Sequence, residues 1–257
     1  MTDGRALARA YLEQQRLLGG DSVILPESAT RGSRPGSGTA PAPSPSRPPG
    51  TSPLPPPGIS FDPAGGDLFT SDPLQQAGSL DAIAALVRGC TKCRLCDGRR
   101  NAVPGEGPAD ARLVVVGEGP GRVEDETGRP FVGPAGELLT KILAAIELPR
   151  ERVFICNVVK CPPPENRLPH YDEIAACAPY LFRQIELLKP KVVLAMGGTA
   201  AQTLLNTKQS IGTLRNQVHR FRGVPVIVTY HPAALLRNPN WKKPTWDDVR
   251  IARRLLD

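Results

Sequence analysis

Six cysteines are the residues of this 257-residue chain whose types and spacing point most directly to a chemistry. Cys90 and Cys93 form a C-x-x-C pair, and Cys96 repeats the same spacing. Cys161 and Cys177 lie further along, on either side of a proline-rich segment. In a protein of the cell interior, clustered cysteines indicate metal binding or redox chemistry before disulfides. Two ligands from each region would make a four-thiolate site, and spacing alone does not distinguish tetrahedral zinc from an iron–sulfur cluster.

Three polar residues lie at or just after the ends of apolar, β-branched segments. They are Glu118, Asn157 and His231. Such segments are typical of buried strands. In an open sheet of parallel strands, ligands bind outside the carboxyl ends of the strands. We therefore expect these three side chains to converge on one site.

The loop that carries Glu118 has the sequence Gly117-Glu-Gly-Pro-Gly121. Its glycines allow the backbone to approach a ligand closely. A dinucleotide-binding fingerprint is excluded, because the third glycine would fall at Arg122 and Pro120 interrupts the turn. Two interpretations remain: an ordinary connection from strand to helix, and a ligand site that pairs Glu118 with a stacking Phe131.

Expected strands and helices alternate from about residue 79 to the end of the chain. The strands are expected at residues 113–116, 153–159, 192–195, 217–221 and 224–230. The helices are expected at residues 80–87, 135–146, 171–188, 199–205 and 246–256, the fourth of them capped by Thr199. This alternation predicts an α/β fold in which a mainly parallel sheet has helices on both faces.

The residues before this domain have a different composition. Residues 1–20 carry a weak amphipathic pattern that predicts an N-terminal helix, and residues 21–78 are rich in Pro, Gly and Ser. A segment of the second kind buries too little apolar surface to offset its conformational entropy, so we expect a disordered linker. The domain proper is expected at residues 79–257. If the chain has a protein partner, the helix or the linker is the expected contact.

The charge balance favours a polyanionic partner. The chain has 32 Lys and Arg against 25 Asp and Glu, a formal charge of +7, and nucleic acid is the first candidate. Aromatic residues make up only 5%, which argues against an extended stacking platform for single strands. No apolar run approaches the roughly 20 residues that span a bilayer, and Asp3 with no apolar core after it argues against secretion. We expect a monomeric, cytoplasmic protein without a membrane partner, associated with the nucleoid through its function.

Several motifs, in the same order, resemble the iron–sulfur-containing family 4 uracil-DNA glycosylases. They are Cys90-Thr-Lys-Cys93-Arg-Leu, Gly117-Glu-Gly-Pro-Gly121 with Glu124-Asp125, Thr127-Gly-Arg-Pro-Phe-Val-Gly133, Asn157-Val-Val-Lys-Cys161, Pro163-Pro-Glu-Asn-Arg167, Cys177, and His231-Pro with Leu235-Leu-Arg-Asn238. The resemblance covers about residue 85 to the C-terminus. It departs from the family at Ala233, where many relatives carry Ser after His-Pro.

The resemblance implies a three-layer α/β/α fold around a central, mainly parallel four-stranded sheet. It implies an enzyme of base excision repair that flips uracil out of double- or single-stranded DNA and hydrolyses its N-glycosidic bond, leaving an abasic site. It also implies a [4Fe–4S] cluster held by four of the cysteines. These are Cys90, Cys93, Cys161 and Cys177, and the motifs leave Cys96 and Cys156 outside the ligand set.

Under this resemblance, the expected catalytic residues are Glu118, Asn157 and His231. The amide of Asn157 would donate to O4 of uracil and accept from N3–H, a pattern that cytosine does not match. His231 would donate toward O2 and stabilise the uracil anion as the bond breaks. Glu118 would position the attacking water or stabilise the cationic sugar, and Phe131 would stack on the flipped base.

The remaining expected contacts involve backbone and DNA. Gly117 and Gly119 would let the backbone approach uracil closely. Leu235 or Leu236 would wedge into the vacated base stack, although each is equally well explained as a core leucine of a helix. Arg237, next to them, is an expected contact of the DNA backbone.

Three alternative functions remain open. A related class crosslinks covalently to the abasic sugar through a His in the insertion Lys-Arg-Arg-Ile-His, but the equivalent region here reads Pro163-Pro-Glu-Asn-Arg-Leu-Pro-His170 and retains only His170. A non-enzymatic iron–sulfur or zinc protein that binds DNA would make the convergence of Glu118, Asn157 and His231 a coincidence. A glycosylase of broader range would also accept hypoxanthine or xanthine.

Overall fold

The computed structural model describes residues 72–257, so the expected N-terminal helix and most of the expected linker lie outside the described residues. The short helix α2 (Pro73–Gln76) precedes the expected start of the domain. Its Leu74 is buried, and the guanidinium of Arg183 donates to the backbone oxygen of Ala77 at 3.0 Å. Residues just before 79 therefore pack on the folded unit as well.

A single five-stranded sheet lies at the centre of the fold, in the order β2-β1-β3-β5-β4. The strands are β1 (Leu113–Gly117), β2 (Val153–Asn157), β3 (Val192–Met196), β4 (Val218–Phe221) and β5 (Val224–Thr229). The mainly parallel sheet is confirmed, because only the edge strand β4 is antiparallel to its neighbour. The resemblance implied a sheet of four strands, and the edge strand β4 makes a fifth. Arg222 and Gly223 both have positive φ, which suits the tight hairpin between β4 and β5.

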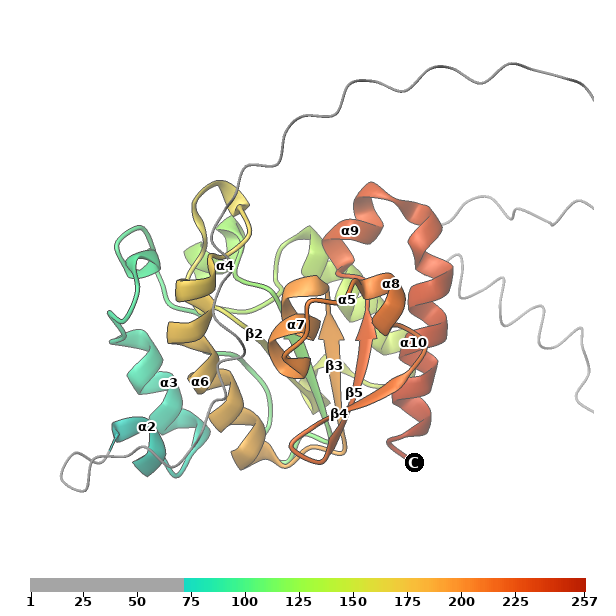
Figure 1. Cartoon of the computed structure of the whole chain (residues 1–257), viewed down its shortest axis with the longest axis horizontal. Helices are drawn as coiled ribbons and strands as arrows, with labels where there is room; N and C mark the ends of the chain where they lie inside the picture. The colour runs from blue at the N-terminus through green and yellow to red at the C-terminus, as the bar shows by residue number, and fades with distance from the viewer. Residues whose placement is uncertain (1–71) are drawn as a thin grey trace, which may run out of the picture. The chain divides into compact units, whose positions relative to one another are not determined.

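Helices cover both faces of the sheet and complete the expected three layers (Figure 1). One face carries α3 (Leu80–Arg88), α6 (Tyr171–Leu188) and α7 (Gly198–Leu205), and the other carries α5 (Pro134–Ala145) and α10 (Lys242–Arg254). The shorter elements are α4 (Arg122–Thr127), α8 (Ile211–Leu214), α9 (Pro232–Arg237) and 3₁₀ turns at Arg94–Cys96, Arg150–Arg152, Pro164–Asn166 and Pro239–Trp241. None of the helices within residues 72–257 combines the length and the apolar character needed to cross a membrane.

The strands are apolar throughout because both faces of the sheet are buried. In β1, Val114 and Val116 pack in the core under α3, α6 and α7. Leu113 and Val115 of the same strand pack in the core under α5 and α10. This explains why the sequence shows continuous apolar runs and no polar alternation.

The order of the strands creates a crevice beside β1. Strand β1 pairs with both β2 and β3, and the chain leaves β1 toward the face of α5 but leaves β3 toward the face of α7. Loops that leave neighbouring strands in opposite directions open a binding crevice at their carboxyl ends. The expected site residues lie at or just after the carboxyl ends of strands at this edge.

A buried carboxylate attaches the loop that carries Cys90 to Cys96 to helix α6. The Glu173 side chain is 0% exposed and accepts hydrogen bonds from Arg94 Nε at 3.0 Å, from both terminal nitrogens of Arg167 at 2.7 and 2.8 Å, and from the His170 N–H at 2.7 Å. The hydrogen bonds from Arg167 lower the pKa of Glu173 from 4.5 to about 2. The folded state therefore favours the ionised form of this carboxyl group.

We predict that Glu173→Gln lowers the free energy of unfolding by about 1.5–3 kcal/mol at pH 7, because it removes charge-assisted hydrogen bonds. Since the folded-state pKa is lowered, the contribution of Glu173 is complete above pH 4.5 and is lost as the pH falls toward 2. The difference between wild type and variant should therefore shrink in acid. Denaturant unfolding of both proteins at pH 7 and across this acid range measures it.

Glu186 on the same helix provides the control. It pairs with Arg183 and Arg222, but its side chain is 38% exposed, so Glu186→Gln should cost less than about 1 kcal/mol. A Glu173→Gln variant as stable as the Glu186→Gln variant would contradict the proposed role of Glu173.

Candidate active site and thiol cavity

A cleft of about 570 Å³ opens at the carboxyl ends of the parallel strands. Glu118, Asn157 and His231 all line it, and so does Phe131. The predicted convergence of these side chains is therefore found in the structure. The cleft has the size of a typical small-molecule site, which makes it the candidate active site.

Asn157 forms the floor of the cleft. It lies directly opposite Gly117 in the β1–β2 ladder, its residue is 1% exposed, and its Oδ1 accepts no hydrogen bond. A Cβ atom on Gly117 would come within 2.4 Å of this oxygen and 2.5 Å of the Phe131 ring. Because an unpaired buried acceptor costs about 1–3 kcal/mol, the free oxygen of this cleft-lining residue points to a ligand that supplies a donor.

His231 presents a neutral imidazole to the cleft. It caps the N-terminus of α9, and its Nδ1 accepts a hydrogen bond from the Ala233 N–H at 3.2 Å. The ring proton is therefore on Nε2. Burial lowers the pKa of His231 to about 4, and the charge of Arg237 acts in the same direction. At neutral pH this side chain is an uncharged N–H donor.

Glu118 is oriented by the first turn of α7. Its Oε2 accepts a hydrogen bond from the hydroxyl of Thr199 at 2.5 Å. Thr199 was expected to cap α7, but the cap is Gly197, and the Thr199 hydroxyl contacts Glu118 instead. The N-terminal end of a helix favours negative charge nearby, so this position suits a carboxylate. Gly119 also lines the cleft, and a Cβ atom there would come within 2.8 Å of Val159.

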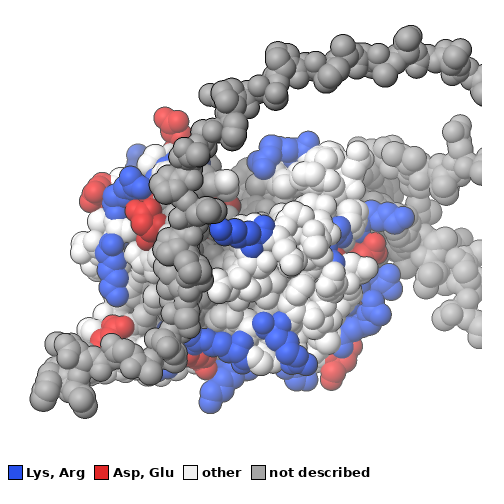
Figure 2. Space-filling view, viewed as in Figure 1, with Lys and Arg blue, Asp and Glu red and all other residues white. Residues whose placement is uncertain are grey.

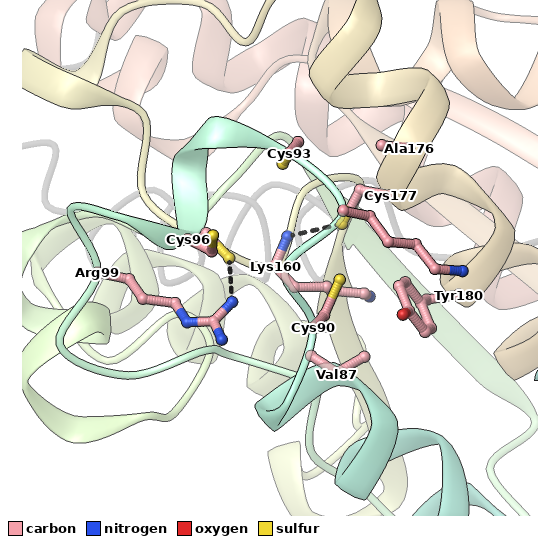
Figure 3. A pocket seen from close by; sticks show the side chains of 11 residues that line it. Val87, Cys90, Cys93, Cys96, Arg99, Lys160, Ala176, Cys177 and Tyr180 are labelled. Carbon is pink, nitrogen blue, oxygen red and sulfur yellow. Dashed lines mark hydrogen bonds between the residues drawn. The ribbon is translucent and has the colours of Figure 1, made fainter.

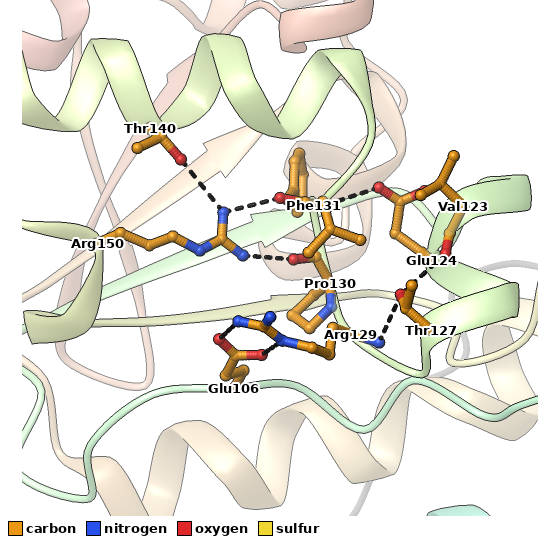
Figure 4. A network of polar contacts seen from close by, with 10 residues as sticks. Glu106, Val123, Glu124, Thr127, Arg129, Pro130, Phe131, Thr140 and Arg150 are labelled. Carbon is orange, nitrogen blue, oxygen red and sulfur yellow. Dashed lines mark hydrogen bonds and ion pairs between the residues drawn. The ribbon is translucent and has the colours of Figure 1, made fainter.

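Phe131 is held in an unusual backbone conformation by groups on both sides (Figure 4). Its φ is +51°, a left-handed value that costs free energy for a residue other than glycine. Arg150 donates to the Phe131 carbonyl at 2.8 Å and to the preceding carbonyl at 2.5 Å. Glu124 Oε1 accepts the N–H groups of the two following residues, both at 2.9 Å. These contacts fix the ring 5.4 Å, centre to centre, from the imidazole of His231.

Three of these supporting residues have contacts that the sequence did not predict. Thr199 follows the end of β3, so the strand-end argument that found Glu118 would also have found it. Glu124 was part of a recognised motif but had no assigned role. Arg150 left no signal, because it reaches Phe131 from a separate 3₁₀ turn.

The two leucines of α9 that were expected as wedge candidates differ in burial. Leu235 is 1% exposed and packs in the core with α5 and α10, as its alternative interpretation as a core leucine expects. Leu236 is 51% exposed. Arg237 is exposed and lines the cleft. One turn of helix thus directs one leucine inward and its neighbour outward.

A second cavity, called here the thiol cavity, lies between α3, α6 and the loop after β2 (Figure 3). Five of the six cysteines line it: Cys90, Cys93, Cys96, Cys161 and Cys177. All six cysteines lie in the described residues, and all are free thiols. Cys156 is buried in β2 and does not line the cavity, as expected from its place in an apolar strand.

The donors around the thiol cavity suit an iron–sulfur cluster. Cys161 Sγ accepts a hydrogen bond from Arg99 at 3.1 Å, and Cys177 Sγ accepts one from the Lys160 N–H at 3.3 Å. Burial raises the pKa of Cys161, and it raises the pKa of Cys177 to about 12, so metal binding would have to displace their protons. Within residues 72–257, no three Cys, His, Asp or Glu side chains are grouped for a single metal ion. A [4Fe–4S] cluster binds each thiolate through a different iron, so its ligands stand farther apart.

Lys160 connects the thiol cavity to Asn157. It lines the cavity and is 1% exposed. Its ammonium group donates one hydrogen bond to the Asn157 carbonyl and another to Gln184 Oε1, each at 2.8 Å. Both of these acceptors are uncharged. A buried cation is costly unless negative charge lies nearby, so this side chain favours an anionic occupant of the thiol cavity.

The surface carries the basic excess expected from the sequence. On the face shown in Figure 2, Lys and Arg side chains lie along the lower margin and near α9 at the top, with fewer acidic side chains between them. Such a distribution favours a polyanion over a small neutral ligand as the partner.

Comparisons with known proteins agree with this site. A profile of the uracil DNA glycosylase superfamily matches residues 104–251. The type-4 uracil-DNA glycosylase of Saccharolobus solfataricus is 46% identical over 187 residues, which cover 69% of this chain and 87% of that protein. The enzyme of the same name from Thermotoga maritima is 49% identical over 181 residues, which cover 69% of this chain and 94% of that protein. The chain therefore belongs to the uracil-DNA glycosylase superfamily and, within it, to the type-4 uracil-DNA glycosylases.

Proposed function

We propose that this protein removes uracil from DNA by hydrolysing its N-glycosidic bond, and that the cleft holds the extruded base. The observation that carries this proposal is the unpaired, buried Oδ1 of Asn157, a residue that lines the cleft together with Phe131. A pyrimidine N–H in the cleft would satisfy it. Stacking against Phe131 would cover the face of the ring.

Asn157 would select uracil over cytosine by hydrogen-bond pattern. Its Oδ1 would accept N3–H and its Nδ2 would donate to O4. Cytosine has an acceptor at N3 and an amino donor at N4, so both contacts would become donor–donor or acceptor–acceptor pairs. A site built from buried polar groups rejects such a mismatch strongly, because its own groups are left unpaired.

His231 and Glu118 would share the chemical step. As the bond between C1′ and N1 breaks, its electron pair stays on uracil, and the Nε2–H of His231 would donate to O2 of the resulting anion. Glu118 would orient a water molecule toward C1′ and stabilise the positive charge on the sugar. The water oxygen bonds to C1′ and its proton leaves to solvent, while the uracil anion takes up a proton after release. Thr199 would keep the Glu118 carboxylate in place.

The DNA contacts would come from the rim of the cleft. Flipping a base out of a duplex costs a few kcal/mol, about the amount that phosphate contacts and a wedge residue can offset. The exposed Leu236 is the candidate wedge, and Arg237 beside it is the candidate phosphate contact.

Cys90, Cys93, Cys161 and Cys177 would hold a [4Fe–4S] cluster in the thiol cavity. The cluster would act as a structural crosslink, and its negative charge would balance the buried ammonium of Lys160. Because Lys160 donates to the Asn157 carbonyl, this crosslink would also fix the floor of the cleft. The alternative of a covalent crosslink to DNA has less support, since His170 is exposed and does not line the cleft.

The proposed function is tested by uracil release from a duplex with a U:G pair. The wild-type protein should release free uracil, and His231→Ala should lower the single-turnover rate by about 10²–10³-fold, since it removes one donor to the developing anion. Because the pKa of His231 is lowered to about 4, the imidazole stays neutral as the pH rises from 5 to 8. The wild-type rate should therefore show no step near pH 6.5.

His219 provides a matched control, because its ring contacts the Leu214 carbonyl at 2.8 Å and lies outside the cleft. His219→Ala should release uracil at close to the wild-type rate. Near-normal release by His231→Ala would remove His231 from the mechanism, and no release by the wild-type protein would contradict the proposed function itself.

Asn157→Asp should lower uracil release by about 10²-fold and narrow the preference for uracil over cytosine, because the carboxylate offers no donor to O4. Oligonucleotides with U:G and C:G pairs, assayed side by side, measure both effects. Asn166→Asp is the control, since Asn166 lines the cleft from an exposed turn. If Asn157→Asp discriminates between the bases as well as wild type does, Asn157 does not read the base.

Cys161→Ser should abolish the brown colour of the purified protein and lower its midpoint of thermal unfolding by about 5–10 °C, because a structural metal site stabilises only the folded state. Visible absorption, iron content and thermal unfolding measure the effect. Cys96→Ser is the matched control and should retain colour and stability, since the motifs leave Cys96 outside the ligand set. The ligand set is wrong if Cys161→Ser keeps both.

A further inference from the structure

Three planar side chains form a layered stack beside the candidate active site. The Tyr230 and Trp241 rings lie 4.6 Å apart, centre to centre, with an angle of 7° between their planes. The guanidinium of Arg215 lies 4.6 Å from the centre of the Tyr230 ring. Near-parallel rings at this spacing attract each other, and a cation over the tyrosine face adds to the attraction.

The inner end of the stack is anchored in the core. Arg215 Nε donates to Asp248 at 2.6 Å, and the same guanidinium donates to the Pro244 carbonyl at 2.5 Å. The Asp248 side chain is 0% exposed and also accepts the Thr229 hydroxyl at 2.8 Å. The stack therefore rests on a rigid base that is bonded to β5 and α10.

The outer end of the stack is exposed at the cleft. Tyr230 and Trp241 both line the cleft that contains Asn157 and His231. Trp241 is 37% exposed although Tyr230 covers one of its faces. Leu236, in the neighbouring helix, is also exposed. Trp241 therefore presents part of its ring to the cleft from a base that is fixed in the core.

We propose that Trp241 is a stacking subsite for an unpaired base next to the extruded uracil. An indole ring presents a flat apolar surface of the size of a base, and such stacking tolerates any of the four bases. A base inside a duplex is already covered by its neighbours, so this subsite favours single-stranded DNA or DNA opened around the uracil. Aromatic residues make up only 5% of the chain, too few for an extended stacking platform, but this subsite needs a single tryptophan on a fixed base.

This inference rests on the proposed function and is tested by binding. The probe is a single-stranded oligonucleotide with one 2′-fluoro-2′-deoxyuridine, whose fluorine slows glycosidic cleavage. Three further oligonucleotides replace the base on the 5′ side, the 3′ side or both sides of that residue by an abasic spacer. Wild type and Trp241→Ala are compared on all four, by their dissociation constants at one fixed salt concentration.

For wild type, removing one particular flanking base should weaken binding by about 10-fold, within the range measured for one stacked base. Trp241→Ala should bind the intact oligonucleotide about 10-fold more weakly and should lose nothing more when that base is removed. Trp241→Phe should recover part of the loss. If wild type and Trp241→Ala lose equal affinity on removal of each base, the subsite is contradicted.

Intrinsic fluorescence gives a second readout that needs no alanine variant. The chain has two tryptophans, and the other, Trp246, is buried in the core with α5 and α10. Binding of the intact oligonucleotide should quench the wild-type emission, and the oligonucleotide without both flanking bases should not. Equal quenching by both would overturn the inference. Uracil release by wild type from the unmodified strand separately tests the proposed function.

Discussion

The unpaired oxygen of Asn157 is the constraint around which the rest of the site is arranged. Leaving a buried acceptor without a partner costs free energy, and the fold maintains this cost through the β1–β2 register, which places Gly117 opposite Asn157. A side chain at 117 would clash with this oxygen and with the Phe131 ring. Phe131, held at positive φ by Arg150 and Glu124, lines the cleft beside Asn157. The structure thus keeps a free acceptor and an aromatic ring together in the lining of one cleft.

The titratable side chains in and below the cleft are held in positions that suit the same site. The imidazole of His231 is kept neutral by burial, so it can donate a hydrogen bond without carrying a charge into the cleft. The Glu118 carboxylate is held by the Thr199 hydroxyl at the start of α7. On the opposite side of β2, the ammonium of Lys160 joins the Asn157 backbone to the thiol cavity. A metal cluster there would therefore be coupled to substrate recognition through structure, with no redox step required.

The site residues that could be predicted from sequence are those whose positions follow from the ends of the parallel strands. Apolar runs identify buried strands, and parallel topology brings their carboxyl ends together, which was sufficient to place Glu118, Asn157 and His231. Contacts that depend on helix rotation could not be predicted. Two adjacent leucines in α9 do not reveal which one faces the core, and an early Thr in α7 can cap its helix or contact another loop. Partners from distant turns, such as Arg150, left no pattern in the sequence.

Binding of uracil through Asn157 is tested most directly by a crystal structure of the iron-loaded protein with the product uracil. We expect the uracil ring against Phe131, with N3–H within hydrogen-bond distance of Asn157 Oδ1 and O2 within reach of His231 Nε2. Uracil bound elsewhere, or bound in the cleft while Asn157 Oδ1 contacts only solvent, would contradict it.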